Sequence, residues 1–347
     1  AVNSREAGAA WGECEAEGAL RVSPIPQGNN GRCHLAGFRD DHFQAAFALR
    51  NGSLEEVFSA NQETWDISRV AKSFRLEWPR FDTHQKVIQY WNTAISDFEK
   101  GQTKWGINRV VELQLEPGTC FKRMARTTFQ HPNDEPSVVD PTPREKSEIA
   151  RSESQLAGFL DRLNAICRVI DPNMVGLTAT GIEISQLLIL TCIEIENQMR
   201  LVLQKNGYSK DRFDTSDFVK LLQPLHLDEW QLNFLRYPWL NVFAPFLGWD
   251  CTAPTKSLVW WLRYNQAKHN SDRINGQPTL NDVFDAIAAY ASVLSSQFGV
   301  PTVLRKRYEI RQDLSLVSYP KFSEEEIYIP IHALQPALKR VDFPFNR

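Results

Sequence analysis

The stretch Ser257-Leu-Val-Trp-Trp-Leu-Arg-Tyr-Asn-Gln-Ala-Lys-His-Asn270 is the most informative part of this sequence for both fold and function. Its apolar residues recur at helical spacing, and neither glycine nor proline interrupts them. The pattern therefore predicts a helix that begins near Thr255 or Ser257 and ends near Asn270. The second half of this helix is unusually polar for a segment that follows two tryptophans. The polar residues are Arg263, Tyr264, Asn265, Lys268 and His269.

The spacing of Arg263 and His269 limits how they can act together. At about 100° per residue, Asn265 and His269 share a face, whereas Arg263 lies about 120° round the helix and roughly 9 Å away along its axis. One helix cannot easily aim both groups at one small ligand, but two copies about a twofold axis can. A purely structural interpretation also fits, because paired tryptophans are usually core and a polar C-terminal half is usually solvated.

Composition indicates a folded chain with a substantial core. The 347 residues are 42% hydrophobic and include 10 Trp and 20 Phe, which allows one large domain or two smaller ones. The formal charge of −3 gives no overall attraction for nucleic acid or for an anionic membrane, so any RNA contact requires a local basic patch. No apolar run is long enough for a membrane span, and none is predicted.

The sequence lacks the local signatures of several enzyme classes. It has no Gly-rich phosphate loop, no HExxH zinc motif and no GxSxG nucleophile elbow. None of the six cysteines forms a CxxC pair, so no metal site and no cofactor are predicted. The first residues do not resemble a secretory signal, and Cys167 and Cys192 fall on apolar helix faces, as reduced thiols would. These features predict a cytoplasmic protein.

The chain divides by composition into four regions. Residues 1–75 predict a flexible or loosely packed N-terminal region, with a short helical hairpin from Asp41 to Ala60 broken at Asn51-Gly52. Residues 76–143 predict a helix after Pro79, a β-hairpin and a Pro-rich linker. The hairpin combines Ile107–Leu115 with Cys120–Phe129.

Residues 144–300 predict a helical bundle, and residues 301–347 a C-terminal β extension. The helices expected are 144–170, 180–205, 215–222, 257–270 and 279–298. The helix 180–205 is apolar nearly all round at its centre and is expected in the middle of the bundle. Extended runs at 308–317 and 327–331 are expected to pair with the region near residue 110. The predicted fold class is mainly α, with a small antiparallel β element from the two flanking regions.

The helix 180–205 also contains polar groups that need an explanation. Glu194, Glu196 and Asn197 interrupt its apolar surface, and burying an unpaired carboxylate is costly. Either one of the glutamates simply faces solvent, or Glu194 or Asn197 faces a basic group, Arg263 or Lys268, on the polar helix.

The segment Trp260-Trp-Leu-Arg-Tyr-Asn-Gln-Ala-Lys-His269 resembles the last-but-one helix of HEPN domains, whose signature is an Arg, four to six residues and then a His. The resemblance covers about residues 144–300. It implies a metal-independent endoribonuclease that acts as a homodimer in a toxin–antitoxin or anti-phage setting, with an antitoxin or regulatory protein as partner. Other members of the family are noncatalytic nucleotide-binding or protein-interaction modules. The active pattern usually has Asn, Asp or His directly after the Arg, where this chain has Tyr264.

The resemblance implies catalytic roles for Arg263 and His269. A His can serve as base or acid at neutral pH, and an Arg offers a permanently charged fork for phosphate oxygens. Asn265, one turn before His269, is expected to orient the ring or to bind phosphate, and Lys268 adds local positive charge. In such a dimer the aromatic face of Trp260, Trp261 and Tyr264 is expected to lie partly at the interface.

Overall fold

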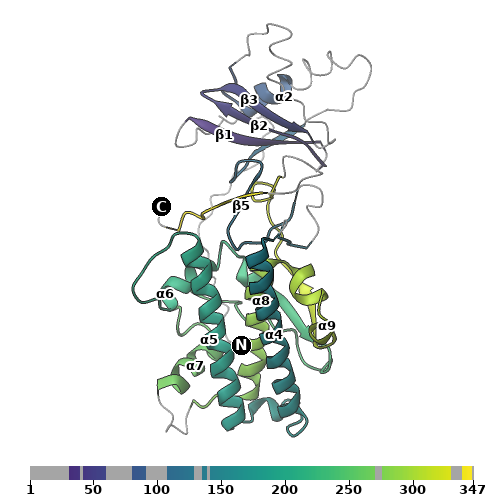
Figure 1. Cartoon of the computed structure of the whole chain (residues 1–347), viewed down its shortest axis with the longest axis vertical. Helices are drawn as coiled ribbons and strands as arrows, with labels where there is room; N and C mark the ends of the chain where they lie inside the picture. The colour runs from purple at the N-terminus through teal and green to yellow at the C-terminus, as the bar shows by residue number, and fades with distance from the viewer. Residues whose placement is uncertain are drawn as a thin grey trace, which may run out of the picture.

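The computed structural model describes residues 31–39, 42–59, 80–90, 108–128, 135–138, 141–269, 276–329 and 338–345. Figure 1 shows the N-terminal strands at one end of the molecule and the long helices at the other, with β5 between them. About half of the Pro-rich linker expected at residues 131–143, and the second half of the helix expected after Pro79, lie outside the described residues.

The chain is mixed α/β, so the prediction of a mainly α fold is wrong. Helix accounts for 45% of the structure and strand for 19%, in three small sheets. The largest sheet has the strand order β3-β2-β1-β4, with antiparallel neighbours throughout. Its strands are β1 (Arg32–Arg39), β2 (His42–Arg50), β3 (Ser53–Ser59) and β4 (Arg109–Glu112).

The helical hairpin expected from Asp41 to Ala60 is a β-hairpin. Asn51 and Gly52 connect β2 to β3 and both have positive φ, 49° and 79°. Two successive positive φ angles are what a tight two-residue hairpin turn requires, and Asn-Gly is the dipeptide that adopts them most easily. The phenylalanine spacing fits a helix as well as a strand, but this turn selects the strand.

Both faces of the N-terminal sheet are covered. On one face, Phe47 and its neighbours pack against Phe81 and against Val87 of α2 (His84–Tyr90). On the other face, Phe38 and Ala46 pack against Ile327 and Ile329 of the C-terminal region. Residues 32–50, which the composition of the N-terminal region led us to expect loosely packed, therefore contribute buried strands.

The remaining strands pair differently from the predicted pattern. β5 (Thr119–Phe121) does not form a hairpin with β4; it pairs in parallel with β8 (Lys339–Val341), so the element shared by the flanking regions is parallel rather than antiparallel. The segment expected as a strand from Tyr308 begins as helix α9 (Tyr308–Asp313) and continues as β7 (Leu314–Ser318). β7 pairs antiparallel with β6 (Gln231–Phe234). Tyr328 forms only an isolated bridge.

The long helices predicted for the central region are confirmed. Capping boxes at Thr142 and Thr279 start two of them, because each threonine side chain exchanges bonds with an acid three residues later. The bounds are α4 (Pro143–Cys167), α5 (Ile182–Lys205), α6 (Thr215–Phe218), α7 (Val259–His269) and α8 (Leu280–Phe298). Short turns complete the region: η2 (Gly176–Thr178), η3 (Val219–Leu221), η4 (Leu227–Glu229) and the π-helix η5 (Pro301–Arg305).

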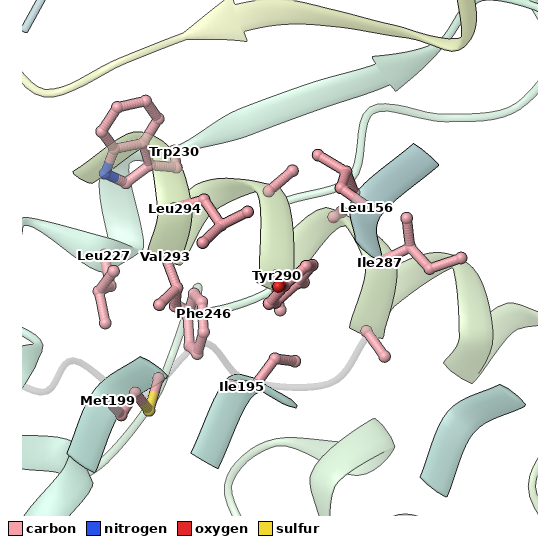
Figure 2. Packing of buried hydrophobic residues seen from close by; sticks show 14 of the residues in the cluster. Leu156, Ile195, Met199, Leu227, Trp230, Phe246, Ile287, Tyr290, Val293 and Leu294 are labelled. Carbon is pink, nitrogen blue, oxygen red and sulfur yellow. The ribbon is translucent and has the colours of Figure 1, made fainter. Parts of the chain in front are cut away.

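The middle helix is α8, not the helix 180–205 as expected. Every residue of α8 is buried except Asn281 and Asp285, whereas α5 exposes Leu190 and Ile193. Alanines and serines form much of α8, and such small side chains let α4 and α5 approach it closely. Figure 2 shows side chains of this core: Leu156 of α4, Ile195 and Met199 of α5, and Ile287, Tyr290, Val293 and Leu294 of α8.

A buried charged cluster ties the C-terminal region to the helices. Arg126 is almost completely buried, with its guanidinium near the rings of Phe121, Phe322 and Tyr328. Glu326 lies 3.9 Å from Arg126 Nη2 and 3.1 Å from His226 Nε2. Burial opposes the charge of Glu326, but the bond from His226 and the charge of Arg126 lower its pKa to about 2. Paired in this way, the buried carboxylate remains ionised.

Within the described residues, no helix is long and apolar enough to cross a membrane.

Replacing Ile287 by Ala is expected to reduce the free energy of unfolding by about 2–5 kcal/mol, because Ile287 is fully buried in the central helix and the cavity cannot fill from solvent. The matched control is Ile193→Ala on α5. Ile193 is 37% exposed, so its truncation should cost less than about 1 kcal/mol. Urea unfolding monitored by circular dichroism measures both, and equal losses would contradict the central position of α8.

Candidate functional site

Helix α7 is held in place by its tryptophans. Trp260 donates from Nε1 to the carbonyl oxygen of Pro245 at 2.8 Å, and Trp261 stacks on Trp249 with ring centroids 5.8 Å apart. Trp260, Trp261 and Tyr264 are all buried in the core of this chain. The expectation that they lie partly at a dimer interface is therefore wrong: the two tryptophans instead fix α7 against the segment that contains Pro245, Phe246 and Trp249.

Arg263 reaches from α7 to the first turn of α8. Its Nη1 atom donates to both carboxylate oxygens of Asp282, at 3.0 and 2.8 Å, and to Thr279 Oγ1 at 3.0 Å. All three bonds use one nitrogen. Nη2 and Nε form no hydrogen bond with any residue in the described part of the chain, and the side chain is 32% exposed. The guanidinium is thus oriented from one side and remains accessible from the other.

Two aspartates of α8 set the charge beside Arg263. Asp282 is buried and also accepts from the Thr279 backbone N–H at 2.7 Å, which closes the capping box. Asp285 accepts from Asn281 Nδ2 at 2.8 Å. Burial, followed by the neighbouring charge of Asp282, raises the pKa of Asp285 to about 7, although Arg263 opposes the shift. A carboxyl that titrates near neutral pH therefore lies within electrostatic reach of Arg263. We call these five residues, Arg263, Thr279, Asn281, Asp282 and Asp285, the α7–α8 site.

A separate polar group lies between α7 and α5. Lys268 Nζ donates to the Tyr264 hydroxyl at 3.0 Å and lies 3.5 Å from Glu196 Oε2. Burial raises the pKa of Tyr264 above its usual value, and the negative charge of Glu196 acts in the same direction. The thiol of Cys192 is fully buried beside this group, and its pKa is raised, chiefly by burial. Tyr264 and Lys268 are therefore bound within the chain, in a cluster that joins two helices.

The other predicted residues are distributed as follows. Asn265 Nδ2 donates to the carbonyl oxygen of Trp261 at 3.1 Å, within its own helix. His269 is the last residue of α7, and its side chain lies outside the described part of the structure. Glu194 accepts a long bond from Asn197, which in turn accepts from Arg200, so neither side chain pairs with α7. The acid of α5 that pairs with a basic residue of α7 is Glu196, opposite Lys268.

Sequence reasoning named Arg263 as a candidate but missed the partners that the structure gives it. Asp282 and Thr279 lie nineteen and sixteen residues later, and a capping box directly after the Arg helix is the one local signal that could have marked them. His226 was also missed: its ring nitrogens lie 2.7 Å from Glu229 and 3.1 Å from Glu326. Its pKa is raised by those two carboxylates, against the effect of burial.

No group of three or more His, Cys, Asp and Glu within the described ranges could hold a metal ion. The chain matches no protein-family model, no curated protein and no solved structure. Inference about function therefore rests on the motif and on the geometry of the α7–α8 site.

Replacing Asp285 by Asn is expected to flatten the dependence of stability on pH. Since the pKa of Asp285 is about 7 in the folded protein and near 3.8 when unfolded, its neutral form stabilises the fold below about pH 4. That contribution is lost as the pH rises through about 7. Asn imitates the neutral carboxyl at every pH. Between pH 4 and pH 8, the free energy of unfolding of the variant should therefore rise relative to that of the wild type by roughly 1–3 kcal/mol, after allowance for solvent screening.

The measurement is the free energy of unfolding in urea at several pH values. Asp211→Asn is the matched control, because Asp211 is exposed and lies on a different part of the chain. If the difference in free energy of unfolding between Asp285→Asn and the wild type stays constant from pH 4 to pH 8, Asp285 does not titrate in this range.

Proposed function

We propose that this chain is a metal-independent endoribonuclease of the HEPN type, with Arg263 and His269 as its catalytic pair. The observation that carries the proposal is the state of the Arg263 guanidinium. It is oriented through Nη1 by Asp282 and Thr279, while its other edge is accessible. A pre-oriented arginine fork beside solvent is suited to bind the non-bridging oxygens of a phosphodiester without the cost of ordering the side chain at the moment of reaction.

The chemistry follows from the residue types. Neutral His269 removes the proton of the RNA 2′-hydroxyl, whose oxygen attacks the adjacent phosphorus. The bond from phosphorus to the 5′-oxygen breaks, that oxygen takes up a proton, and a 2′,3′-cyclic phosphate and a 5′-hydroxyl remain. Arg263 stabilises the negative charge that accumulates on the phosphorane oxygens. Asp285, with a pKa of about 7, is protonated in part of the molecules at neutral pH and is therefore a nearby proton donor.

We further propose that two copies of the chain form the site. Arg263 and His269 are six residues apart on α7, about 120° round the helix and roughly 9 Å along it. A twofold axis beside α7 would bring Arg263 of each copy against His269 of the other. In a toxin–antitoxin or anti-phage setting, an antitoxin or regulatory protein would act by covering this face.

A second candidate, a noncatalytic nucleotide-binding or interaction module, is favoured by the internal bonds of the motif. Tyr264 replaces the usual polar residue after the Arg and is buried, and Lys268 is engaged by Tyr264 and Glu196. In that case Arg263 would bind a phosphate of an intact nucleotide, and no RNA would be cut.

His269→Ala is expected to reduce cleavage of single-stranded RNA by about 100-fold or more, because the proton acceptor is lost. Arg263→Lys is expected to reduce cleavage by roughly 100-fold, since an ammonium keeps the charge toward Asp282 but cannot supply the fork. Arg263→Ala is unsuitable because it leaves the buried Asp282 unpaired. Gln266→Ala, an exposed residue of the same helix, is the matched control. EDTA should not change the rate.

A mixture of the two variants tests the composite site. A heterodimer of His269→Ala and Arg263→Lys contains one intact site, so mixing should restore roughly a quarter of wild-type activity. Unchanged cleavage by His269→Ala, or a requirement for divalent metal, would refute the proposed mechanism. Nucleotide binding by a chain that leaves RNA uncut would support the second candidate.

A further inference from the structure

A second charged surface lies away from the α7–α8 site. In Figure 1, α9 lies beside α4 on one side of the helices, and α7 lies on the other side, beyond α5. The segment Arg305-Lys-Arg-Tyr-Glu-Ile-Arg311, which spans the end of η5 and most of α9, has four cationic residues and one acid. In a chain with a net charge of −3, this is a local excess of positive charge.

Apart from the buried Ile310, the side chains of this segment are exposed or partly exposed. Arg307 Nη1 donates to Ser154 Oγ of α4 at 2.9 Å, which fixes the segment against that helix. Tyr308 is 60% exposed, and the guanidinium of Arg311 lies 5.7 Å from the centre of its ring. Lys306 is exposed and forms no hydrogen bond or ion pair with residues of the described part of the chain. Tyr308 therefore presents one face of an aromatic ring among three cations.

The surface continues along α4 through the segment that follows β6. The Leu235 N–H donates to the carbonyl oxygen of Asp313 at 2.8 Å, and Arg236 forms an ion pair with the Asp313 carboxylate. Asp313 also accepts from Asn164 Nδ2 of α4 at 3.2 Å. Arg236 is half exposed, so its charge is held in place by a buried acid and still reaches solvent.

Trp239 ends this surface. Its Nε1 donates to the carbonyl oxygen of Pro172 at 3.1 Å, while the side chain remains 59% exposed. The ring of Tyr237 packs edge-on against it with centroids 5.9 Å apart. An exposed tryptophan held by a hydrogen bond and a neighbouring ring is a rigid platform rather than a loose side chain.

The anchors give these groups an order along the axis of α4. Ser154 and Asn164 are about 15 Å apart on α4 at 1.5 Å per residue, and Pro172 follows soon after the end of the helix. Tyr308 and Trp239 thus lie toward opposite ends, with cations between them. We call this surface the α4 track. Its residues are Arg236, Trp239, Lys306, Arg307, Tyr308 and Arg311.

We propose that the α4 track binds single-stranded nucleic acid, with bases stacked on Tyr308 and Trp239 and the backbone phosphates on the cations. Exposed aromatic rings separated by cations suit a strand whose bases are unpaired, because the bases of a duplex have no free faces for stacking. Glu309 and Asp161 are exposed nearby and offset part of the positive charge. Binding should therefore be moderate in affinity and strongest at low salt. The inference goes beyond the proposed nuclease and does not require cleavage.

The test is fluorescence anisotropy with labelled single-stranded RNA, single-stranded DNA and duplex RNA, on the full chain carrying His269→Ala so that the RNA is not cut. Tyr308→Ala and Trp239→Ala should each weaken binding of the single strands about tenfold. Lys306→Ala combined with Arg311→Ala should weaken binding at low salt and reduce its dependence on salt. The matched controls are Leu247→Ala and Lys256→Ala, exposed residues outside the track, which should bind as the parent does.

Ultraviolet cross-linking to RNA followed by mass spectrometry provides a second measurement on the chain without track substitutions, with cross-links expected on peptides containing Tyr308 or Trp239. The inference would be overturned by any of four results: no binding at low salt, equal binding by track variants and controls, a preference for duplex RNA, or equally strong binding to anionic vesicles. If the chain binds single strands through the track but never cuts RNA, the proposed nuclease fails and the α4 track stands.

Discussion

The ion pair between Arg263 and Asp282 is the interaction that connects the fold of the helices to the candidate site. Helix α8 is surrounded by other elements, so an acid in its first turn is removed from water. An unpaired carboxylate at such a place costs several kcal/mol, and losing one partner of a buried pair typically costs about 3–5 kcal/mol. Arg263 compensates that charge from α7. The position of α7 is therefore set by the tryptophans on one face and by this pair on another.

The same pair shows how Arg263 can stabilise the fold and still present part of its guanidinium to a ligand, as the proposed function requires. Asp282 and Thr279 engage only Nη1 of the guanidinium, so the charge is fixed in direction while one edge stays open. Asp285, three residues further along α8, feels both Asp282 and Arg263. One buried acid thus determines the orientation of an arginine and contributes to the raised pKa of a second acid. The charge of this site and the stability of the helices are coupled through a few atoms.

Much of the helical part of the fold could be predicted from local pattern. The helices at 143–167, 182–205 and 280–298 have a clear repeat and capping residues, and such signals act within one or two turns. The N-terminal sheet was missed because phenylalanines spaced four apart suit either a helix or a strand. Only the Asn51-Gly52 turn distinguishes them. The pairing of β5 with β8 joins residues more than two hundred positions apart, and no local pattern specifies it.

The choice of the central helix illustrates a different limit of prediction from local sequence. The apolar run at the centre of α5 suggested that helix, but α8 is the more hydrophobic of the two along its whole length. Burial on all sides also depends on how closely neighbours can approach, which the alanines and serines of α8 allow. Within the site, Arg263 was identifiable as a candidate, whereas its partners were not. The sequence pointed to Glu194 or Asn197 as the partner of a basic residue on α7, whereas the structure has Glu196. A shift of one or two residues along a helix rotates the side chain by about 100° or 200°, so a small error in position selects the wrong face.

Tyr264 shows how packing can account for a residue that differs from the pattern which the motif resembles. The position directly after Arg263 points into the space between α7 and α5, where Trp261 and Cys192 are also buried. A short amide or carboxylate there would need buried partners of its own. The tyrosine ring fills the space, and its hydroxyl reaches Lys268 beside Glu196, so its polar atom is satisfied at the edge of the core. The tyrosine at this position therefore has a structural cause on the α5 side of α7, and it does not take part in the bonds between Arg263 and α8.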